Sequence, residues 1–264
     1  MPACSEYYTD LRDKISPVGV GDKSELLYLF IMTFAQKIIN FNEHLTYTGL
    51  TLPPDIGIMN PYAGDMPQAE TVRAIGRAFY EKYYSDDHRR HLILGINPGR
   101  FGGGLTGVPF TDPKRLRTEC DLHFNIPDAH EQSSVFIYEM INAFGGPEAF
   151  YKKLYINSAF PLGFVQIKNG KEVNYNYYDS KALIDAVRPA IIENIRTQIG
   201  MGVYTDVCFC FGTGKNYEFL NKLNNEHGFF GKLVPLEHPR FIMQYKSKHK
   251  QEYIDKYLEA FSDL

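Results

Sequence analysis

The stretch that decides the fold is residues 91–110, HLILGINPGRFGGGLTGVPF. It begins with a continuous apolar run at residues 92–94, which is typical of a strand buried on both faces of a parallel sheet. Asn97-Pro98-Gly99 ends this run, because proline cannot donate to a sheet and glycine tolerates the backbone of a tight turn. A glycine-rich loop follows at residues 102–104. Ligands of open α/β sheets bind beyond the carboxyl ends of the strands, so Asn97 is a candidate functional residue.

The rest of the chain alternates strands and helices around this segment. Apolar runs predict three further strands, and apolar residues at helical spacing predict the helices between them. The strands are expected at residues 153–160, 206–212 and 232–239, and the helices at residues 22–41, 72–83, 133–144, 180–200 and 248–261. Asn169-Gly170 between extended flanks predicts a hairpin within residues 166–178. This order predicts one α/β domain over residues 1–264, with a central sheet of four mostly parallel strands.

Three segments lack this periodicity and are expected to be irregular. Residues 1–21 are expected to form a loosely ordered lead-in to a helix that Asp22 caps, with Glu25 as the partner of a capping box. Residues 51–61 are interrupted by prolines, and residues 111–126 are polar. The N-terminal part of the chain is therefore predicted to be a helical lead-in to the sheet.

Composition narrows the class of protein. The formal net charge of −3 argues against a generally basic DNA coat, but it is compatible with a local basic face. The sequence has no run of eighteen or more apolar residues and no apolar core of a signal peptide near its start, so we expect a cytoplasmic protein, nucleoid-associated if it is bacterial. Its four cysteines form no CxxC pair, which makes a zinc or iron–sulfur site a poor interpretation.

Three polar side chains occur where strands are predicted to end. Asn97 ends the first strand, Asn157 lies near the end of the second, and His238 ends the fourth. The carboxyl ends of parallel strands share one edge of a sheet, so these residues are expected to converge on one crevice. Two amides and an imidazole suit a substrate with amide-like donors and acceptors, such as the edge of a pyrimidine. Without a strong base or nucleophile among them, catalysis would rest on positioning and charge stabilisation.

Several motifs resemble one family. GINPGRFG at residues 95–102 and TGVPF at residues 106–110 resemble the first motif of the single-strand-selective monofunctional uracil-DNA glycosylases, the SMUG branch of the uracil-DNA glycosylase superfamily. YIN at residues 155–157, with Pro161 after it, resembles the second motif. NPY at residues 60–62 and LEHP at residues 236–239 resemble the lead-in segment and the third motif. The likeness spans about residues 24–260 and points to bacterial SMUG-like proteins.

The resemblance implies a three-layer α/β sandwich and an enzyme of base excision repair. Such a monofunctional glycosylase flips a damaged base out of DNA and hydrolyses its N-glycosidic bond. Uracil is the expected base, with 5-hydroxymethyluracil and deaminated purines as further candidates. Gly103 stands where relatives carry a bulkier apolar residue, which leaves the handling of the base 5-position open. The expected partner is single- or double-stranded DNA, and we expect a monomer that needs no metal and no cofactor.

The resemblance also implies a role for each motif residue. Asn97 would position the attacking water, and His238 would stabilise the negative charge on the departing uracil. Asn157 would hydrogen-bond N3 and O4 of uracil, and Phe110 would stack on the flipped base. The rest of the expected substrate pocket comes from the first motif, namely Gly99, Phe101 and Gly103.

Departures from the family pattern mark the expected DNA contacts. The third motif continues here as Arg240-Phe241 instead of a proline-rich pattern, so either side chain is a candidate to fill the space left by the flipped base. Arg100 replaces a proline and is a candidate phosphate contact or a solvated residue. Lys246 and Lys248 are further candidates, either as phosphate contacts or as solvated positions at the start of the last helix.

Each of these residues also has a structural interpretation. Asn97 suits an ordinary turn, Asn157 a strand whose backbone satisfies it, His238 a strand end, and Phe110 a core. The alternative function is therefore a catalytically weak or inactive module that binds pyrimidines or DNA on the same fold. The joint presence of both asparagines and the histidine favours the enzyme. Alkaline cleavage of uracil-containing single-stranded DNA after incubation separates the two hypotheses.

Overall fold

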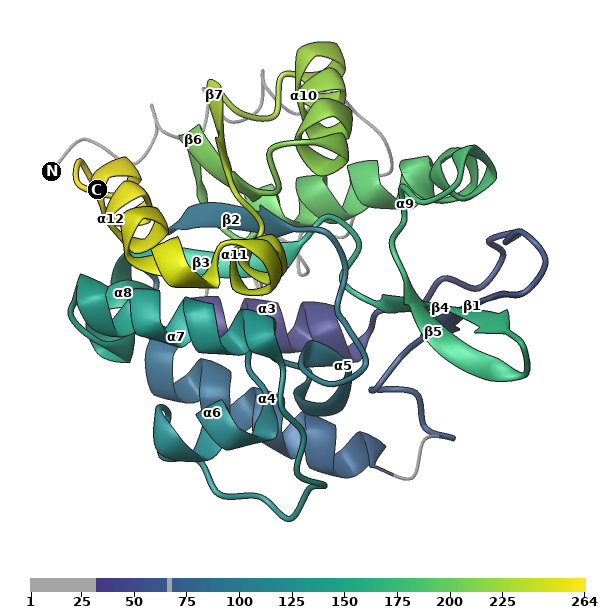
Figure 1. The fold of residues 1–264 in the computed structure, drawn as a ribbon, viewed down its shortest axis with the longest axis horizontal. Coiled ribbons are helices and arrows are strands. Elements are labelled where there is room, and N and C mark those ends of the chain that lie inside the picture. The colour runs from purple at the N-terminus through teal and green to yellow at the C-terminus, as the bar shows by residue number, and fades with distance from the viewer. Residues whose placement is uncertain (1–31, 66–67) are drawn as a thin grey trace, which may run out of the picture. The chain divides into compact units, whose positions relative to one another are not determined.

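The strands of the central sheet are parallel and lie in the order β3-β2-β6-β7 (Figure 1). Their bounds are β2 (His91–Gly95), β3 (Leu154–Ser158), β6 (Tyr204–Phe211) and β7 (Lys232–Leu236). Strand β2 lies between β3 and β6, with Leu94 paired to Asn157 on one side and to Cys210 on the other. The predicted sheet is confirmed, and all four of its strands run in the same direction.

The structure is a computed structural model that describes residues 32–65 and 68–264. The lead-in expected at residues 1–21 and the cap expected at Asp22 lie outside the described residues. Within them, the predicted N-terminal helix begins at Phe34 as α3 (Phe34–Glu43). Thr33 caps this helix, because its hydroxyl accepts a hydrogen bond from the backbone N–H of Gln36 at 3.2 Å. Residues 33–264 form one compact unit.

The predicted helices that follow are confirmed, with shifts of a few residues at their ends. They are α4 (Ala69–Tyr84), α7 (Gln132–Phe144), α9 (Lys181–Gly200) and α12 (Lys250–Ala260). Helix α8 (Pro147–Lys153) precedes β3, and α10 (Lys215–His227) connects β6 to β7. Connections of this kind are expected, because parallel strands need a crossover and a helix is its usual form.

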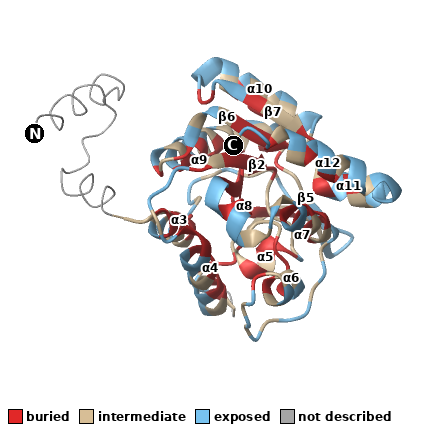
Figure 2. Cartoon of the chain, turned by 90° about the vertical axis from the view of Figure 1, so that its left-hand side faces the viewer, coloured by how far each residue is buried: buried red, intermediate tan, exposed pale blue. Residues whose placement is uncertain are grey.

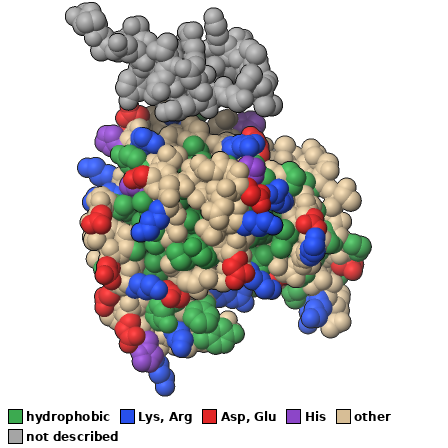
Figure 3. Space-filling model, turned by 90° about the horizontal axis from the view of Figure 1, so that it is seen from above, with side chains coloured by type: hydrophobic (Ala, Val, Ile, Leu, Met, Phe, Trp, Pro, Cys, Tyr) green, Lys and Arg blue, Asp and Glu red, His purple; other side chains and the backbone are tan. Residues whose placement is uncertain are grey.

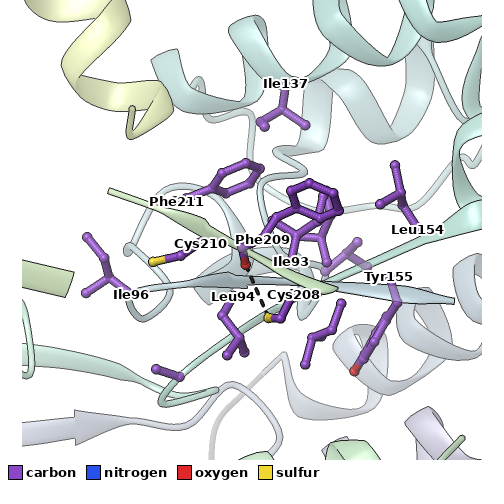
Figure 4. Close-up of a cluster of buried hydrophobic side chains, with 14 of the residues drawn as sticks. Ile93, Leu94, Ile96, Ile137, Leu154, Tyr155, Cys208, Phe209, Cys210 and Phe211 are labelled. Atoms are coloured by element: carbon purple, nitrogen blue, oxygen red, sulfur yellow. Dashed lines mark hydrogen bonds between the residues drawn. The ribbon is translucent and has the colours of Figure 1, made fainter. Parts of the chain in front are cut away.

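Helices cover both faces of the central sheet, so the predicted three-layer sandwich is confirmed (Figure 1). On one face Phe211 stacks on Tyr257 of α12, with ring centroids 5.6 Å apart. On the other face Tyr155 packs edge-on against Phe34 of α3, with centroids 5.4 Å apart. Figure 4 shows Phe211 on the side of Ile137 from α7, and Tyr155 on the opposite side. Strand β2 is buried between these layers, and its residues 92–94 are at most 1% exposed.

A second, antiparallel sheet has the order β1-β4-β5 and consists of β1 (Ile56–Met59), β4 (Gly163–Lys168) and β5 (Lys171–Tyr175). The predicted hairpin is confirmed as β4 and β5. Asn169 and Gly170 form its turn with φ of 52° and 70°, the left-handed pair that such a tight connection requires. Strand β1 lies in a segment predicted to be a loop. It forms because it pairs with β4, a partner distant in the sequence.

Three short helices were not predicted from the sequence, and two of them lie in segments predicted to be loops. They are α5 (Gly103–Thr106), α6 (Pro113–Thr118) and α11 (Pro239–Tyr245), followed by the 3-10 turn η1 (Ser247–His249). Helix α6 lies in a polar segment, but Asp112 caps it and its first residue is proline, the position at which proline is favoured. Helix α11 likewise begins with a proline directly after His238. The predicted last helix is therefore preceded by a separate helix that carries the residues after the third motif.

The burial pattern follows the layers. Figure 2 shows buried residues on the sides of helices that face the sheet, and exposed residues on their outer sides. On the face drawn in Figure 3, basic and acidic side chains alternate and do not separate into patches of one sign. Among the described residues, no helix is long and apolar enough to span a membrane.

Candidate active site

A cavity of about 590 Å³ lies at the carboxyl ends of the parallel strands. Its wall includes a residue at or just beyond the end of each strand, namely Asn97 after β2, Ser158 in β3, Gly212 after β6 and His238 after β7. This edge is where open α/β sheets bind ligands. The structure therefore brings two of the three predicted polar residues, Asn97 and His238, to one cavity.

The backbone holds the side-chain amide of Asn97 in one orientation. Its Nδ2 donates to the carbonyl oxygen of Tyr175 at 3.0 Å, and its Oδ1 accepts from the N–H of Tyr177 at 3.1 Å. Tyr175 ends β5, so the hairpin of the second sheet reaches the edge of the central sheet. Because one group accepts and the other donates, the two bonds also distinguish the amide oxygen from its nitrogen. One N–H and one lone pair of Asn97 remain for a ligand.

Phe110 forms part of the cavity wall in a strained conformation. Its φ is 54°, a left-handed value that is rare for a bulky residue and is typical of functional sites. The ring packs edge-on against Phe211 at a centroid distance of 5.2 Å and lies 5.8 Å from the ring of His238. Gly95 makes this placement possible, because a Cβ there would lie 3.1 Å from the Phe110 ring.

His238 is a neutral imidazole in the cavity wall. Burial, aided by the nearby charge of Arg240, lowers its pKa to about 4. Its Nδ1 accepts a hydrogen bond from the backbone N–H of Arg240 at 3.2 Å and thereby caps α11. Since Nδ1 is the acceptor, the proton of the neutral ring is on Nε2. The site therefore contains an uncharged donor, Nε2–H, at neutral pH.

Asn157 does not line this cavity but a smaller pocket, whose wall shares Pro98, Gly103 and Pro109 with the larger one. Its side chain is 3% exposed, with Nδ2 donating to the Tyr155 hydroxyl at 2.5 Å and Oδ1 accepting from the N–H of Ser158 at 2.8 Å. Side chains of a strand alternate between faces, so Asn157 shares a face with Tyr155 and the next residue takes the other face. Ser158, which the sequence prediction missed, occupies the cavity wall in its place.

The remaining first-motif residues divide between the cavity and the surface. Gly99 and Gly103 line the cavity, as predicted. Phe101 does not line it and is 52% exposed. The guanidinium of Arg100 lies 5.2 Å from the centre of the Phe101 ring, and its Nε donates to Asn174 Oδ1 at 3.3 Å. Arg100 is thus held beside the cavity by side chains on two sides.

Two aromatic side chains of α11 stand at the mouth of the cavity. Phe241 and Tyr245 both line it, are 42% and 65% exposed, and have ring centroids 5.5 Å apart. Arg240 is exposed beside them and lines the same wall. Lys246 and Lys248 follow as exposed residues outside the wall. Of the predicted DNA contacts after the third motif, Arg240 and Phe241 therefore line the cavity, together with Tyr245, which the sequence prediction missed.

Glu131 is a further cavity residue that the sequence prediction missed. It directly precedes α7, and the start predicted for that helix was the signal that could have found it. Burial, reinforced by Asp112, raises the pKa of its carboxyl to about 7, although a hydrogen bond from Ser134 and the charge of Arg240 act in the opposite direction. Among the described residues, no group of three or more histidine, cysteine, aspartate or glutamate side chains is arranged to hold a metal ion.

The fold and the site together define a class, an α/β protein with a cavity at the carboxyl edge of a parallel sheet. The sequence model of the uracil DNA glycosylase superfamily matches residues 81–262. The chain belongs to this superfamily and is a DNA repair enzyme, a uracil-DNA glycosylase.

The structure is similar to the crystal structure of wild-type SMUG2 from Pedobacter heparinus. The two chains are 62% identical, the TM-score is 0.85, and the match covers 88% of this chain and 98% of that chain. This similarity confirms the predicted bacterial SMUG-like branch. DNA is accordingly the substrate of the class.

Proposed function

We propose that this chain excises uracil from DNA by flipping the nucleotide into the cavity and hydrolysing its N-glycosidic bond. The observation that carries the proposal is the neutral imidazole of His238 beside the ring of Phe110 in one cavity. A flipped base needs a face to stack on and donors for its edge, and this pair supplies both.

His238 carries the largest part of the proposed catalysis. When the bond between C1′ and N1 breaks, its electron pair passes to the base and negative charge develops on the ring and its O2 oxygen. An Nε2–H donor aimed at that oxygen stabilises the charge, and one well-placed donor is worth about 2.7–4 kcal/mol. A neutral ring suits this role, because its proton stays in place from weakly acidic to alkaline pH.

Asn97 positions the water that attacks the sugar carbon. Its remaining lone pair and N–H are oriented by the two backbone bonds to Tyr175 and Tyr177. Such prior orientation lowers the entropic cost of bringing the water to C1′. The amide itself is a feeble base, so its contribution is geometric.

Phe110, Gly99 and Gly103 shape the space for the base. The Phe110 ring provides the stacking face, and the two glycines add no side chain to the cavity wall. A Cβ at Gly103 would lie 3.3 Å from the carbonyl oxygen of Val108, so the local packing favours glycine there. We propose that this wall admits bases with a substituent at C5, such as 5-hydroxymethyluracil.

The mouth of the cavity is proposed to hold the DNA. Phe241, with Tyr245 behind it, is the candidate to fill the space left by the flipped base, since apolar wedges commonly serve this purpose. Arg240, Lys246 and Lys248 are exposed in and directly after α11 and suit contacts with phosphates.

A cleavage assay tests the proposed function. A labelled oligonucleotide with one uracil is incubated with the full chain, treated with alkali and analysed for strand cleavage at that position. The expected result is cleavage of the uracil strand, single- or double-stranded, and no cleavage of a matched cytosine strand. Absence of alkali-labile sites at enzyme excess would refute the proposal. The same assay with 5-hydroxymethyluracil, xanthine and hypoxanthine determines the range of bases.

A further inference from the structure

The wall of the cavity contains one carboxylic acid among the described residues, Glu131. Its Oε2 accepts a hydrogen bond from the hydroxyl of Ser134 at 3.3 Å, and its Oε1 has no hydrogen-bond partner in the described part of the chain. The carboxylate forms no cap hydrogen bond with the backbone of α7. The side chain is only partly buried and forms neither a helix cap nor an ion pair, so its unbonded oxygen is free to contact a ligand in the cavity.

The loop after β2 is built closely around this carboxylate. A Cβ at Gly102 would lie 2.0 Å from Oε2 of Glu131, and a Cβ at Gly99 would lie 3.1 Å from Oε1. Both glycines are in the first-motif segment that also contains Asn97. The carboxylate of Glu131 is thus packed directly on the turn whose other end positions the proposed water.

The proposed reaction also lacks a proton acceptor. A water that attacks C1′ must lose a proton as the new C–O bond forms. The amide oxygen of Asn97 already accepts a bond from Tyr177 and is a feeble base, and the proton of His238 is needed for the departing base. A carboxylate whose pKa lies near neutral pH commonly accepts such a proton as a general base.

We propose that the carboxylate of Glu131 accepts the proton of the attacking water, which makes it a further catalytic residue; this inference rests on the proposed function. In this step the water oxygen bonds to C1′, and its proton passes to Glu131. The bond between C1′ and N1 breaks, and its electron pair leaves with the uracil anion, which the Nε2–H of His238 stabilises. The proton then leaves Glu131 for the uracil anion or for solvent, which restores the carboxylate.

The charges around Glu131 agree with this role. The charge of Asp112, which caps α6, acts on Glu131, and Asp112 is itself paired with Arg115 and faced by His130. Arg240 approaches from α11, and Lys215 of α10 lines the same cavity. With its pKa at about 7, the carboxyl ionises in the range where a general base works best.

Two other groups of the cavity wall have shifted pKa values, and both titrate outside the range of the measurement. The pKa of His238 is about 4, and burial raises that of Tyr178 to about 12. Between about pH 5.5 and about pH 8.5, the ionisation of Glu131 is thus expected to dominate the rate of the chemical step.

The test compares single-turnover excision of uracil by wild type, Glu131→Gln and Glu131→Asp, with Glu148→Gln as control. Glu148 is an exposed glutamate in the first turn of α8, outside the cavity. We expect the wild-type rate constant to rise with pH and to level above about pH 7. Glu131→Gln is expected to be about 10²- to 10⁴-fold slower and independent of pH, with the Kd for uracil DNA changed by less than about threefold. Glu131→Asp should restore part of the rate and the pH dependence, and Glu148→Gln should match wild type.

Three outcomes would overturn the inference. If Glu131→Gln keeps the wild-type rate and pH profile while His238→Ala is impaired, Glu131 is not the base and the proposed function stands. If Glu131→Gln fails to fold, as circular dichroism would show, a flat wild-type profile across the same pH range overturns the inference on its own. A wild type that releases no uracil removes both the inference and the proposed function.

Discussion

The ring of Phe110 lies 5.8 Å from the imidazole of His238, with an angle of 49° between their planes. One residue comes from the loop after α5 and the other from the end of β7, so the contact exists only in the folded chain. It joins a stacking face to a hydrogen-bond donor, the two features that the proposed excision of uracil requires.

Replacing Phe110 by alanine should weaken the binding of the flipped base. Base stacking on an aromatic ring is worth about 1–3 kcal/mol, so the Kd for DNA with a non-cleavable uracil analogue should rise by about 5- to 150-fold. Binding of undamaged DNA should change little, and Phe110→Tyr should retain the effect of the ring. Equal losses for both DNAs in a fluorescence titration would contradict a stacking role.

His238→Ala should reduce the single-turnover rate of uracil excision by about 10²- to 10³-fold, because it removes the donor to the departing base. DNA affinity should change by less than about threefold. His249→Ala is the matched control, since His249 is exposed and pairs with Glu252 outside the cavity. A rate equal to that of wild type would show that the imidazole does not assist the leaving group.

Asn157→Ser is expected to lower stability and to leave base discrimination intact. It removes the bonds to Tyr155 and Ser158, and loss of buried polar partners costs about 1–3 kcal/mol of unfolding free energy. Asn224→Ala is the control for a loss of stability alone, because the side chain of Asn224 also bonds backbone groups and lies outside the cavity. A changed ratio of uracil to cytosine excision rates would restore Asn157 to the base-reading role predicted from sequence.

Lys246→Ala should weaken binding to all DNA sequences to a similar extent. Each lost phosphate contact lowers the slope of log K against log salt by about 1, which titrations at several salt concentrations measure. Lys181→Ala provides the comparison, because Lys181 is equally exposed but pairs with Asp185 at the start of α9. An unchanged salt slope for Lys246→Ala would place the phosphates elsewhere.

Glu131→Gln should stabilise the protein at alkaline pH relative to acidic pH. The folded-state pKa of about 7 exceeds the ordinary glutamate value of 4.5, so the folded state binds the proton more tightly than the unfolded state. The stability that this gives the wild type is complete below about pH 4.5 and is lost as pH rises through about 7. The glutamine variant does not titrate, so it should gain up to about 3 kcal/mol relative to wild type near pH 8.5. Urea titrations at pH 5 and 8.5 measure this difference, and an equal effect at both values would contradict the raised pKa.

The main features of the fold were predictable from local patterns. The apolar runs of the four parallel strands, the helical spacing between them and the Asn169-Gly170 turn all predicted elements that are confirmed. These signals are strong because each depends on residues close in sequence. Strand β1 and helices α5, α6 and α11 were missed, since β1 depends on pairing with β4 and the three helices are too short to show a period.

The sequence by itself determined that Asn97 and His238 lie at the same edge of the sheet, because each directly follows a strand that runs in the same direction as its neighbours. It could not decide which way a residue inside a strand points. Asn157 faces Tyr155 and Ser158 faces the cavity, and an offset of one residue exchanges the two. The position of Glu131 was also decided only by tertiary structure. The carboxylate of Glu131 reaches the cavity because this residue, at the start of α7, packs against Gly99 and Gly102. Local patterns specify where an element ends, whereas contact between distant elements specifies which side chains share a site.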